Sequence, residues 1–87
     1  MKAIEYIVTD AVGLHARPAG ALVKKASEYQ SNIMIKNTES GKSADAKRIM
    51  GIMALGIKQG NKIEMSFEGP DEEVAVKELE DFLKENL

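Results

Sequence analysis

The sequence predicts an α+β fold in which helices cover one face of a mainly antiparallel, four-stranded sheet. Segments of alternating apolar and polar residues, typical of strands with one face in water, are interleaved with segments of helical spacing. Their order is strand, helix, strand, strand, helix, strand, helix, which places the helices in one layer against the sheet. The chain of 87 residues suits one small domain, residues 1–87, with little core to spare.

The first strand is expected over residues 3–9, where Ile4, Tyr6 and Val8 recur at every second position. We expect the face formed by these three residues to be fully buried and the opposite face to be partly covered. A loop of residues 10–13 follows. Asp10 in this loop either orients a neighbouring side chain or serves only the turn, and turn chemistry is the more usual role of an aspartate there.

The first helix is expected to begin between Ala16 and Pro18. Proline is tolerated in a first helical turn, where its missing N–H has no partner to lose, and it breaks a helix at later positions. The residue before a proline is biased away from helical angles, so the first helical residue stays open. Apolar residues then recur at helical spacing, at Ala19, Leu22, Val23 and Ala26.

The second half of the chain continues the same alternation of elements. A strand over 33–36 turns at 37–41 into a short third strand from 42 to 45 or 46. A helix is expected from about 48 to 54, with Ile52 and Leu55 facing the core. The clearest strand spans 62–68, with Ile63, Met65 and Phe67 directed inward.

The last helix follows Gly69-Pro70. Its first turn is expected to hold three solvated acids that match the helix dipole, Asp71, Glu72 and Glu73. Its buried stripe is expected to consist of Ala75, Leu79, Phe82 and Leu83.

Composition excludes several classes of function. With no cysteine and a single histidine, we expect no disulfide, no metal site and no cofactor. Twelve basic and fourteen acidic residues give a net charge of −2, which disfavours a general nucleic-acid binder. No apolar stretch approaches a membrane span, and Glu5 stands where a signal peptide would be apolar. We therefore expect a cytoplasmic protein with no membrane insertion.

The only histidine, His15, precedes the first helix. A helix N-terminus carries roughly half a positive charge and N–H groups without intrahelical acceptors, which suits an anion such as phosphate. Arg17 adds a guanidinium that can grip phosphate oxygens. The positive surroundings favour a neutral imidazole with a free lone pair, as a nucleophile requires. These residues suggest a histidine that accepts a phosphoryl group, although a solvated or capping histidine is an open alternative.

Two stretches resemble one known family. Gly13–Ala19 (GLHARPA) looks like the active-site signature of HPr, the histidine-containing phosphocarrier family of the phosphoenolpyruvate-dependent sugar phosphotransferase system (PTS). Lys47–Gly56 is similar to the second helix of that family, especially in Gram-positive members. The resemblance covers essentially the whole chain. It implies an open-faced β-sandwich of four strands and three helices, with the element order βαββαβα.

The resemblance also implies a mechanism. Phosphorylated enzyme I would offer its phosphoryl group to Nδ1 of His15, which would pass it to a IIA domain of a sugar permease. His15 would be a covalent carrier without turnover chemistry of its own, Arg17 a charge clamp, and the first helical N–H groups, at Ala16 and Arg17, the phosphate donors. We expect the carrier to work as a monomer.

By the same resemblance, one surface would engage both enzyme I and the IIA domains. Its apolar centre would consist of Ala16, Gly20, Ile49, Met50 and Met53. Its basic rim, which would steer acidic partners, would consist of Lys24, Lys47 and Arg48. Exposed methionine suits such a surface because its unbranched, polarizable side chain adapts to several partners. For Met53, simple core filling is an equal alternative.

Arg48 departs from the family pattern. In many Gram-positive HPr proteins the aligned position is a serine that a dedicated kinase phosphorylates. Arg48 has no hydroxyl and carries the opposite charge to a phosphoserine, so the resemblance implies no regulatory serine here. A serine would also be a good helix N-cap, and its absence costs about 1 kcal/mol.

Two other functions remain open. One is a phosphocarrier that serves regulation, in a nitrogen-linked chain or a dihydroxyacetone kinase system. The other is a docking module whose histidine motif has lost its chemistry, although the intact pair of His15 and Arg17 argues against it.

Overall fold

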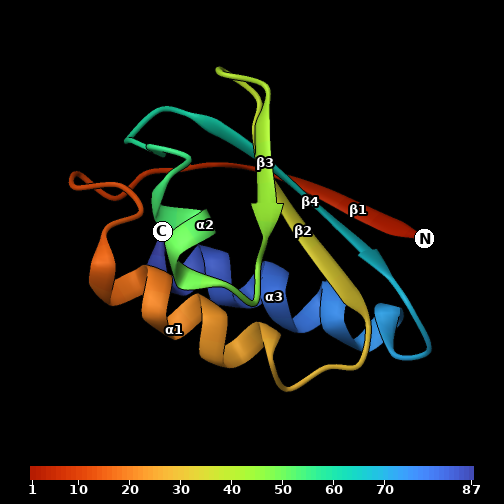
Figure 1. Ribbon diagram of the computed structural model, residues 1–87. Helices are drawn as coiled ribbons and strands as arrows, with labels where there is room; N and C mark the ends of the chain where they lie inside the picture. The colour runs from red at the N-terminus through yellow and green to blue at the C-terminus, as the bar shows by residue number, and fades with distance from the viewer.

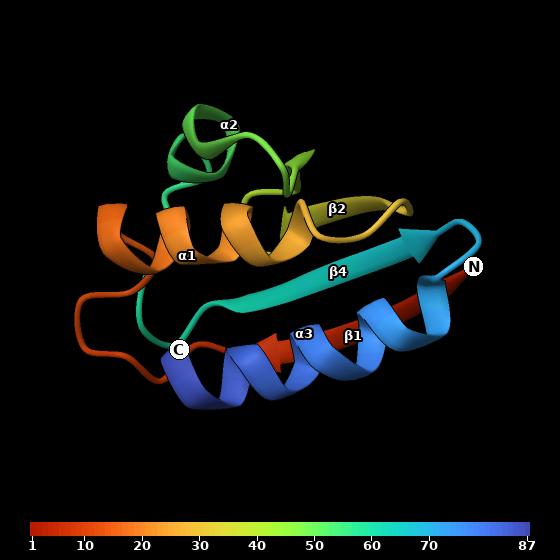
Figure 2. The same cartoon turned by 90° about the horizontal axis from the view of Figure 1, so that it is seen from below.

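The computed structural model describes residues 1–87 as a four-stranded sheet covered on one face by three helices (Figure 1). Figure 2 shows α1 and α3 running side by side over the sheet, with α2 next to α1. The predicted fold class and element order are confirmed. The elements are β1 (Lys2–Ile7), α1 (Ala16–Ala26), β2 (Asn32–Asn37), β3 (Lys42–Asp45), α2 (Ile49–Met53), β4 (Lys62–Glu68) and α3 (Glu72–Asn86).

The strands pair in the order β1-β4-β2-β3, and every neighbouring pair is antiparallel. β4 is therefore a central strand, with Met65 opposite Ile4 of β1 on one side and Ile35 of β2 on the other. Its alternation appears as predicted, because Ile63, Met65 and Phe67 are fully buried under the helices. Only β2 and β3 form a hairpin of consecutive strands.

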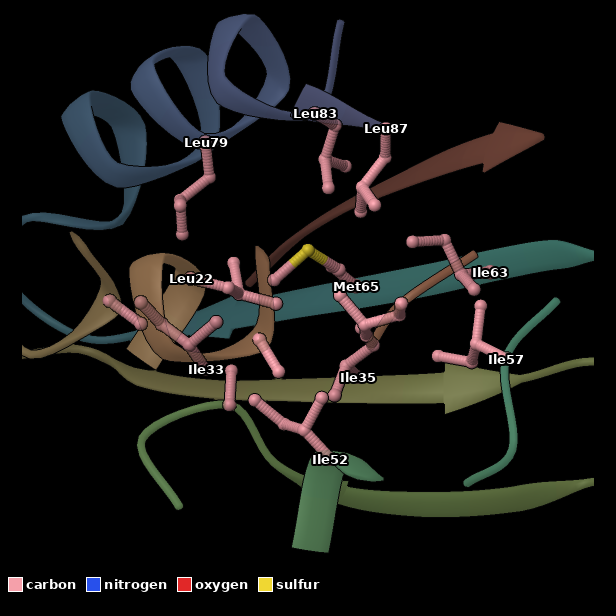
Figure 3. Packing of buried hydrophobic residues seen from close by; sticks show 14 of the residues in the cluster. Leu22, Ile33, Ile35, Ile52, Ile57, Ile63, Met65, Leu79, Leu83 and Leu87 are labelled. Atoms are coloured by element: carbon pink, nitrogen blue, oxygen red, sulfur yellow. The ribbon is translucent and has the colours of Figure 1, made fainter. Parts of the chain in front are cut away.

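One hydrophobic core joins the sheet to all three helices. Figure 3 shows Leu22 of α1, Ile52 of α2 and Leu79 of α3 converging on the inner face of the sheet. Each of these side chains is fully buried, and each complete burial of a Leu or Ile stabilises the fold by about 1.5–3 kcal/mol. Ile52 and Leu55 face the core as expected. This packing fixes the orientation of α1 and α2 relative to the sheet, and with it the position of the loop before α1.

β1 is less buried than its alternation suggested. The strand ends at Ile7, and of the three inward residues only Val8, just beyond it, is fully buried. Ile4 and Tyr6 are half-buried, and Ile7 on the opposite face is 58% exposed. The prediction of one fully buried face was wrong because β1 is an edge strand, which has a neighbour in the sheet on one side only. Alternation shows which face a residue occupies and not how far the helices cover that face.

The start of α3 also differs from the prediction. The helix begins at Glu72, and the carboxylate of Asp71 is bound by the loop before β2 rather than solvated. It accepts hydrogen bonds from the N–H of Gln30 (2.8 Å), the N–H of Ser31 (3.0 Å) and the hydroxyl of Ser31. Asp71 therefore links α3 to β2. Phe82, expected in the buried stripe, is half-buried.

Acid is expected to weaken this link. Hydrogen bonds from the Ser31 hydroxyl and the Gln30 N–H lower the pKa of Asp71 below its ordinary value. A carboxylate with a lowered pKa stabilises the fold above its unfolded-state pKa, and that stability is lost as the pH falls through the folded-state pKa, hence below about pH 4. Urea unfolding between pH 7 and pH 2 should give a smaller pH-dependent loss for Asp71→Asn than for the wild type. Equal losses in both proteins would contradict the assigned role of Asp71.

Candidate functional site

His15 is the N-cap residue of α1. Its backbone is extended (φ −95°, ψ −172°), and its carbonyl accepts a hydrogen bond from the N–H of Ala19 (2.9 Å). α1 thus begins at Ala16, inside the predicted range. The imidazole makes no capping hydrogen bond and is half-buried. The ring therefore stands free at the positive end of the helix.

The loop before His15 is held by backbone contacts. The N–H of Leu14 donates to the carbonyl oxygen of Ile57 (3.1 Å), and the N–H of His15 donates to that of Gly13 (3.1 Å). Gly13 has φ +79°, and a β-carbon there would lie 2.6 Å from the Ile57 oxygen. Only glycine fits both the conformation and the space. The loop consequently presents His15 in one defined position.

Asp10 serves the turn, which was the favoured interpretation. Its Oδ1 accepts a hydrogen bond from the N–H of Val12 (2.9 Å), and the N–H of Gly13 donates to its carbonyl oxygen (3.0 Å). These bonds shape the loop that precedes His15. Asp10 makes no hydrogen bond to the imidazole.

Two free N–H groups and a guanidinium surround the histidine. The first-turn N–H groups of Ala16 and Arg17 have no intrahelical acceptor, Pro18 has no N–H, and the N–H of Ala19 is already bonded to His15. Arg17 is exposed and forms no salt bridge. The structure therefore brings the predicted phosphate-binding residues together at one end of α1.

A surface pocket at this point has one wall that the sequence did not reveal. It is lined by Asp10, His15, Arg17, Pro18, Ala21 and Asn86. Asn86 comes from the last turn of α3, which reaches the loop because the main-chain oxygen of Leu87 accepts three hydrogen bonds. The donors are the N–H groups of Thr9 (2.6 Å) and Asp10 (2.8 Å) and the hydroxyl of Thr9 (2.8 Å). No local pattern connects residues so far apart in the chain.

An exposed apolar surface lies on α2 beside α1. We call Ile49, Met50 and Met53 the α2 patch; their exposed fractions are 38%, 79% and 43%. The exposure of Met53 shows that the core-filling alternative was wrong. Gly20 of α1 faces this patch, since a β-carbon there would lie 3.8 Å from Cδ1 of Ile49. The α2 patch and the His15 end of α1 are therefore parts of one face of the molecule.

The predicted basic residues are placed differently from one another. Lys24 is exposed and stands one turn after Gly20 on the same side of α1. Arg48 is exposed at the N-cap of α2 and makes no capping hydrogen bond. Lys47, in contrast, is half-buried, and its Nζ donates to the carbonyl oxygen of Tyr29 (2.7 Å), beyond the far end of α1 from His15. The structure thus brings Lys24 and Arg48, but not the ammonium of Lys47, to the α2 patch.

No group of three or more His, Cys, Asp or Glu side chains is placed to hold a metal ion. None of the helices is both long and apolar enough to span a membrane.

Residues 2–85 match the family model described as "PTS HPr component phosphorylation site". The chain belongs to the HPr family. It is 41% identical over 85 residues to the phosphocarrier protein HPr of Lysinibacillus sphaericus, an alignment that covers 98% of this chain and 94% of the relative. Membership of this family implies, in general, a phosphocarrier role and PTS proteins as partners.

Solved HPr structures share the fold. HPr-C-His from Thermoanaerobacter tengcongensis matches with a TM-score of 0.91 and 43% identity, over 99% of this chain and 94% of that one. A chain of an HPr dimer from the same organism matches with a TM-score of 0.75 and 44% identity, over 98% and 95%. The open-faced arrangement of four strands and three helices is therefore that of the HPr family.

Proposed function

We propose that residues 1–87 act as one PTS phosphocarrier domain, in which His15 accepts a phosphoryl group from phosphorylated enzyme I and passes it to a IIA domain. One observation carries the proposal: an imidazole without a hydrogen-bond partner stands at the N-terminus of α1 beside two free N–H groups and the free guanidinium of Arg17. This arrangement offers a nucleophile and a binding site for the transferred anion in the same place.

The transfer begins when the lone pair on Nδ1 of His15 attacks the phosphorus of the donor's phosphohistidine. The new N–P bond forms as the donor's N–P bond breaks, and the donor imidazole leaves with the bonding electron pair. The N–H groups of Ala16 and Arg17, together with the Arg17 guanidinium, stabilise the negative charge on the phosphoryl oxygens. A nucleophile on a IIA domain then attacks the phosphorus of phosphorylated His15, the N–P bond at His15 breaks, and the imidazole is free again. Donor and acceptor both belong to partners, so the carrier completes no turnover alone.

The partners would dock on the face that surrounds His15. The α2 patch, with Ala16 and Gly20, supplies an apolar centre, while Lys24 and Arg48 supply positive charge near it. Such a face suits partners with an apolar centre and an acidic rim, because complementary charge raises the rate of encounter. Since Arg48 has no hydroxyl, this face holds no serine at the N-cap of α2 to be phosphorylated. Membership of the HPr family supports a cytoplasmic protein. A monomer stays part of the proposal, although one solved HPr relative is described as a dimer.

The proposal is tested by phosphoryl transfer from phosphoenolpyruvate through purified enzyme I. We expect a mass increase of one phosphoryl group that is acid-labile and maps to His15 by tandem mass spectrometry. Addition of a IIA domain should then remove the label from this chain and transfer it to the IIA domain. An enzyme I preparation that labels another HPr protein but not this chain would refute the relay.

Arg17 is expected to matter for transfer and not for folding. Replacing it with alanine should lower the transfer rate by about tenfold to a hundredfold, because a charged donor to the phosphoryl oxygens is lost. Arg17→Lys should be intermediate, since an ammonium keeps the charge and loses the two-pronged geometry. The matched control is Lys36→Ala, which removes a positive charge from an exposed position on β2. Equal rates for Arg17→Ala and Lys36→Ala would contradict the assigned role of Arg17.

A further inference from the structure

The sulfur atoms of this protein are unevenly exposed. The chain has no cysteine and five methionines, so thioethers are its only sulfur groups. Met65 is completely buried, whereas Met50 is 79% exposed and Met53 is 43% exposed. Met1 and Met34 are exposed at 77% and 39%. Because oxidation of methionine follows access to the sulfur, four of the five methionines are open to an oxidant in water.

Two of these methionines share one functional surface. Met50 and Met53 are three residues apart on α2, so their side chains lie on neighbouring parts of the helix surface. With Ile49 they make up the whole α2 patch. Met34 differs, because it alternates with the buried Ile33 and Ile35 of β2 and therefore points away from the helices. Met34 and Met53 are thus similarly exposed, but on opposite sides of the molecule.

We propose that Met50 and Met53 form an oxidation site at which a peroxide weakens docking of enzyme I to the α2 patch; this inference rests on the proposed function. The sulfur lone pair attacks one oxygen of hydrogen peroxide, the O–O bond breaks, and water leaves after proton transfer. Each sulfur loses two electrons and becomes a sulfoxide, while the peroxide is reduced. The sulfoxide is neutral, as the thioether is, and its formation breaks no backbone hydrogen bond. Its effect is therefore confined to the surface.

The sulfoxide changes what the patch can bind. A thioether is apolar and adaptable, whereas a sulfoxide presents a strong hydrogen-bond acceptor. When enzyme I covers the α2 patch, the sulfoxide oxygen is removed from water and finds no hydrogen-bond donor in the apolar interface. Burying such an unpaired polar group is unfavourable. We expect the dissociation constant for enzyme I to rise by about tenfold. Methionine sulfoxide reductases reverse the reaction, so the change can act as a switch.

The fold itself tolerates the change. Met50 and Met53 are exposed, and it is Ile52 and Leu55 that anchor α2 and the following turn in the core. The imidazole of His15 has no sulfur among the residues that line its pocket. Oxidation of the α2 patch should therefore weaken docking without changing the stability of the fold or the chemistry at His15.

The experiment treats the full-length protein with hydrogen peroxide, removes the oxidant and quantifies the sulfoxide at each methionine by mass spectrometry. Phosphoryl transfer from enzyme I is then measured at subsaturating carrier, before and after treatment. Two variants are compared with the wild type: the double variant Met50→Leu/Met53→Leu, and Met34→Leu as the matched control. Leucine keeps the volume and apolar character of methionine but cannot be oxidised in this way. Each protein's untreated rate is its own reference.

We expect sulfoxide at Met50 and Met53 but not at Met65, and a transfer rate about tenfold lower in the treated wild type and in treated Met34→Leu. The double variant should keep its untreated rate, even though Met1 and Met34 become oxidised in it. Unchanged transfer with both sulfoxides present, an equal loss in the double variant, or a lowered thermal midpoint in the treated wild type would each overturn the inference. Absence of transfer to the untreated wild type would instead refute the proposed function, and the switch would fall with it.

Discussion

Replacing His15 with alanine is expected to abolish phosphoryl labelling by enzyme I completely and to leave the fold intact. The imidazole makes no hydrogen bond within the chain. His15 contributes to α1 through its main-chain carbonyl, which accepts from the N–H of Ala19 and which alanine also has. The free energy of urea unfolding should therefore differ from that of the wild type by less than about 1 kcal/mol. Labelling and unfolding measured on the same preparation test both statements. Residual acid-labile label on the variant would show that another residue is the acceptor.

A second substitution at the same position distinguishes the phosphoryl-carrier role of His15 from its role as the N-cap residue of α1. His15→Asp places a carboxylate at the N-cap, where it can accept a hydrogen bond from the free N–H of Arg17. We expect this variant to be more stable than the wild type by about 1 kcal/mol, a rise of about 4–8 °C in Tm, and to be unlabelled. A more stable protein without the carrier function would indicate that the position is kept for chemistry at the expense of helix stability. A destabilised His15→Asp would contradict this account of the N-cap.

Gly69→Ala is expected to have the largest effect on stability. Gly69 connects β4 to α3 with φ +157°, and a β-carbon there would lie 2.6 Å from Cα and 2.7 Å from Oγ of Ser31. Ser31 cannot retreat, because it is fully buried and held by Asp71. The β-carbon of alanine would force the backbone at Gly69 away from the backbone at Ser31. This displacement should lower the free energy of unfolding by about 3 kcal/mol or more. Chemical denaturation measures this loss directly.

The matched control is Gly41→Ala in the turn between β2 and β3. Gly41 has φ +76°, but a β-carbon there would meet nothing within 4 Å. Its substitution carries only the conformational penalty of a non-glycine residue, about 1–2 kcal/mol. The difference between the two variants isolates the steric clash at Ser31. Equal destabilisation of the two variants would show that this contact is not as tight as the structure indicates.

The elements of this fold were readable from the sequence where one local pattern determines them. The alternation of β4 and the position of Pro18 near the start of α1 depend on neighbouring residues alone, and both predictions agree with the structure. The degree of burial was less predictable. Ile4 and Tyr6 have the pattern of buried residues, but β1 lies at the edge of the sheet, and the strand order is not visible in the segment itself.

The candidate site shows the same division. His15 and Arg17 were found because they are close in sequence and one helix terminus gives both a role. Asn86 was missed because only the docking of α3 on the loop before α1 brings it to the pocket. The resemblance placed Lys47 in the basic rim, but its ammonium donates a hydrogen bond to the Tyr29 carbonyl. Charge alone does not determine the direction of a long, flexible side chain.

The strand order also determines when the loop that carries His15 can be held in place during synthesis. β1 and the loop that carries His15 are made before the other elements of the fold, yet the sole neighbour of β1 in the sheet is β4, the last strand to be made. The end of α3, which holds Thr9 and Asp10 in place, is made later still. Contacts between segments so distant in sequence slow folding, because a long loop must close before they form. A nascent chain therefore contains His15 well before it can form the contacts that hold the loop around it.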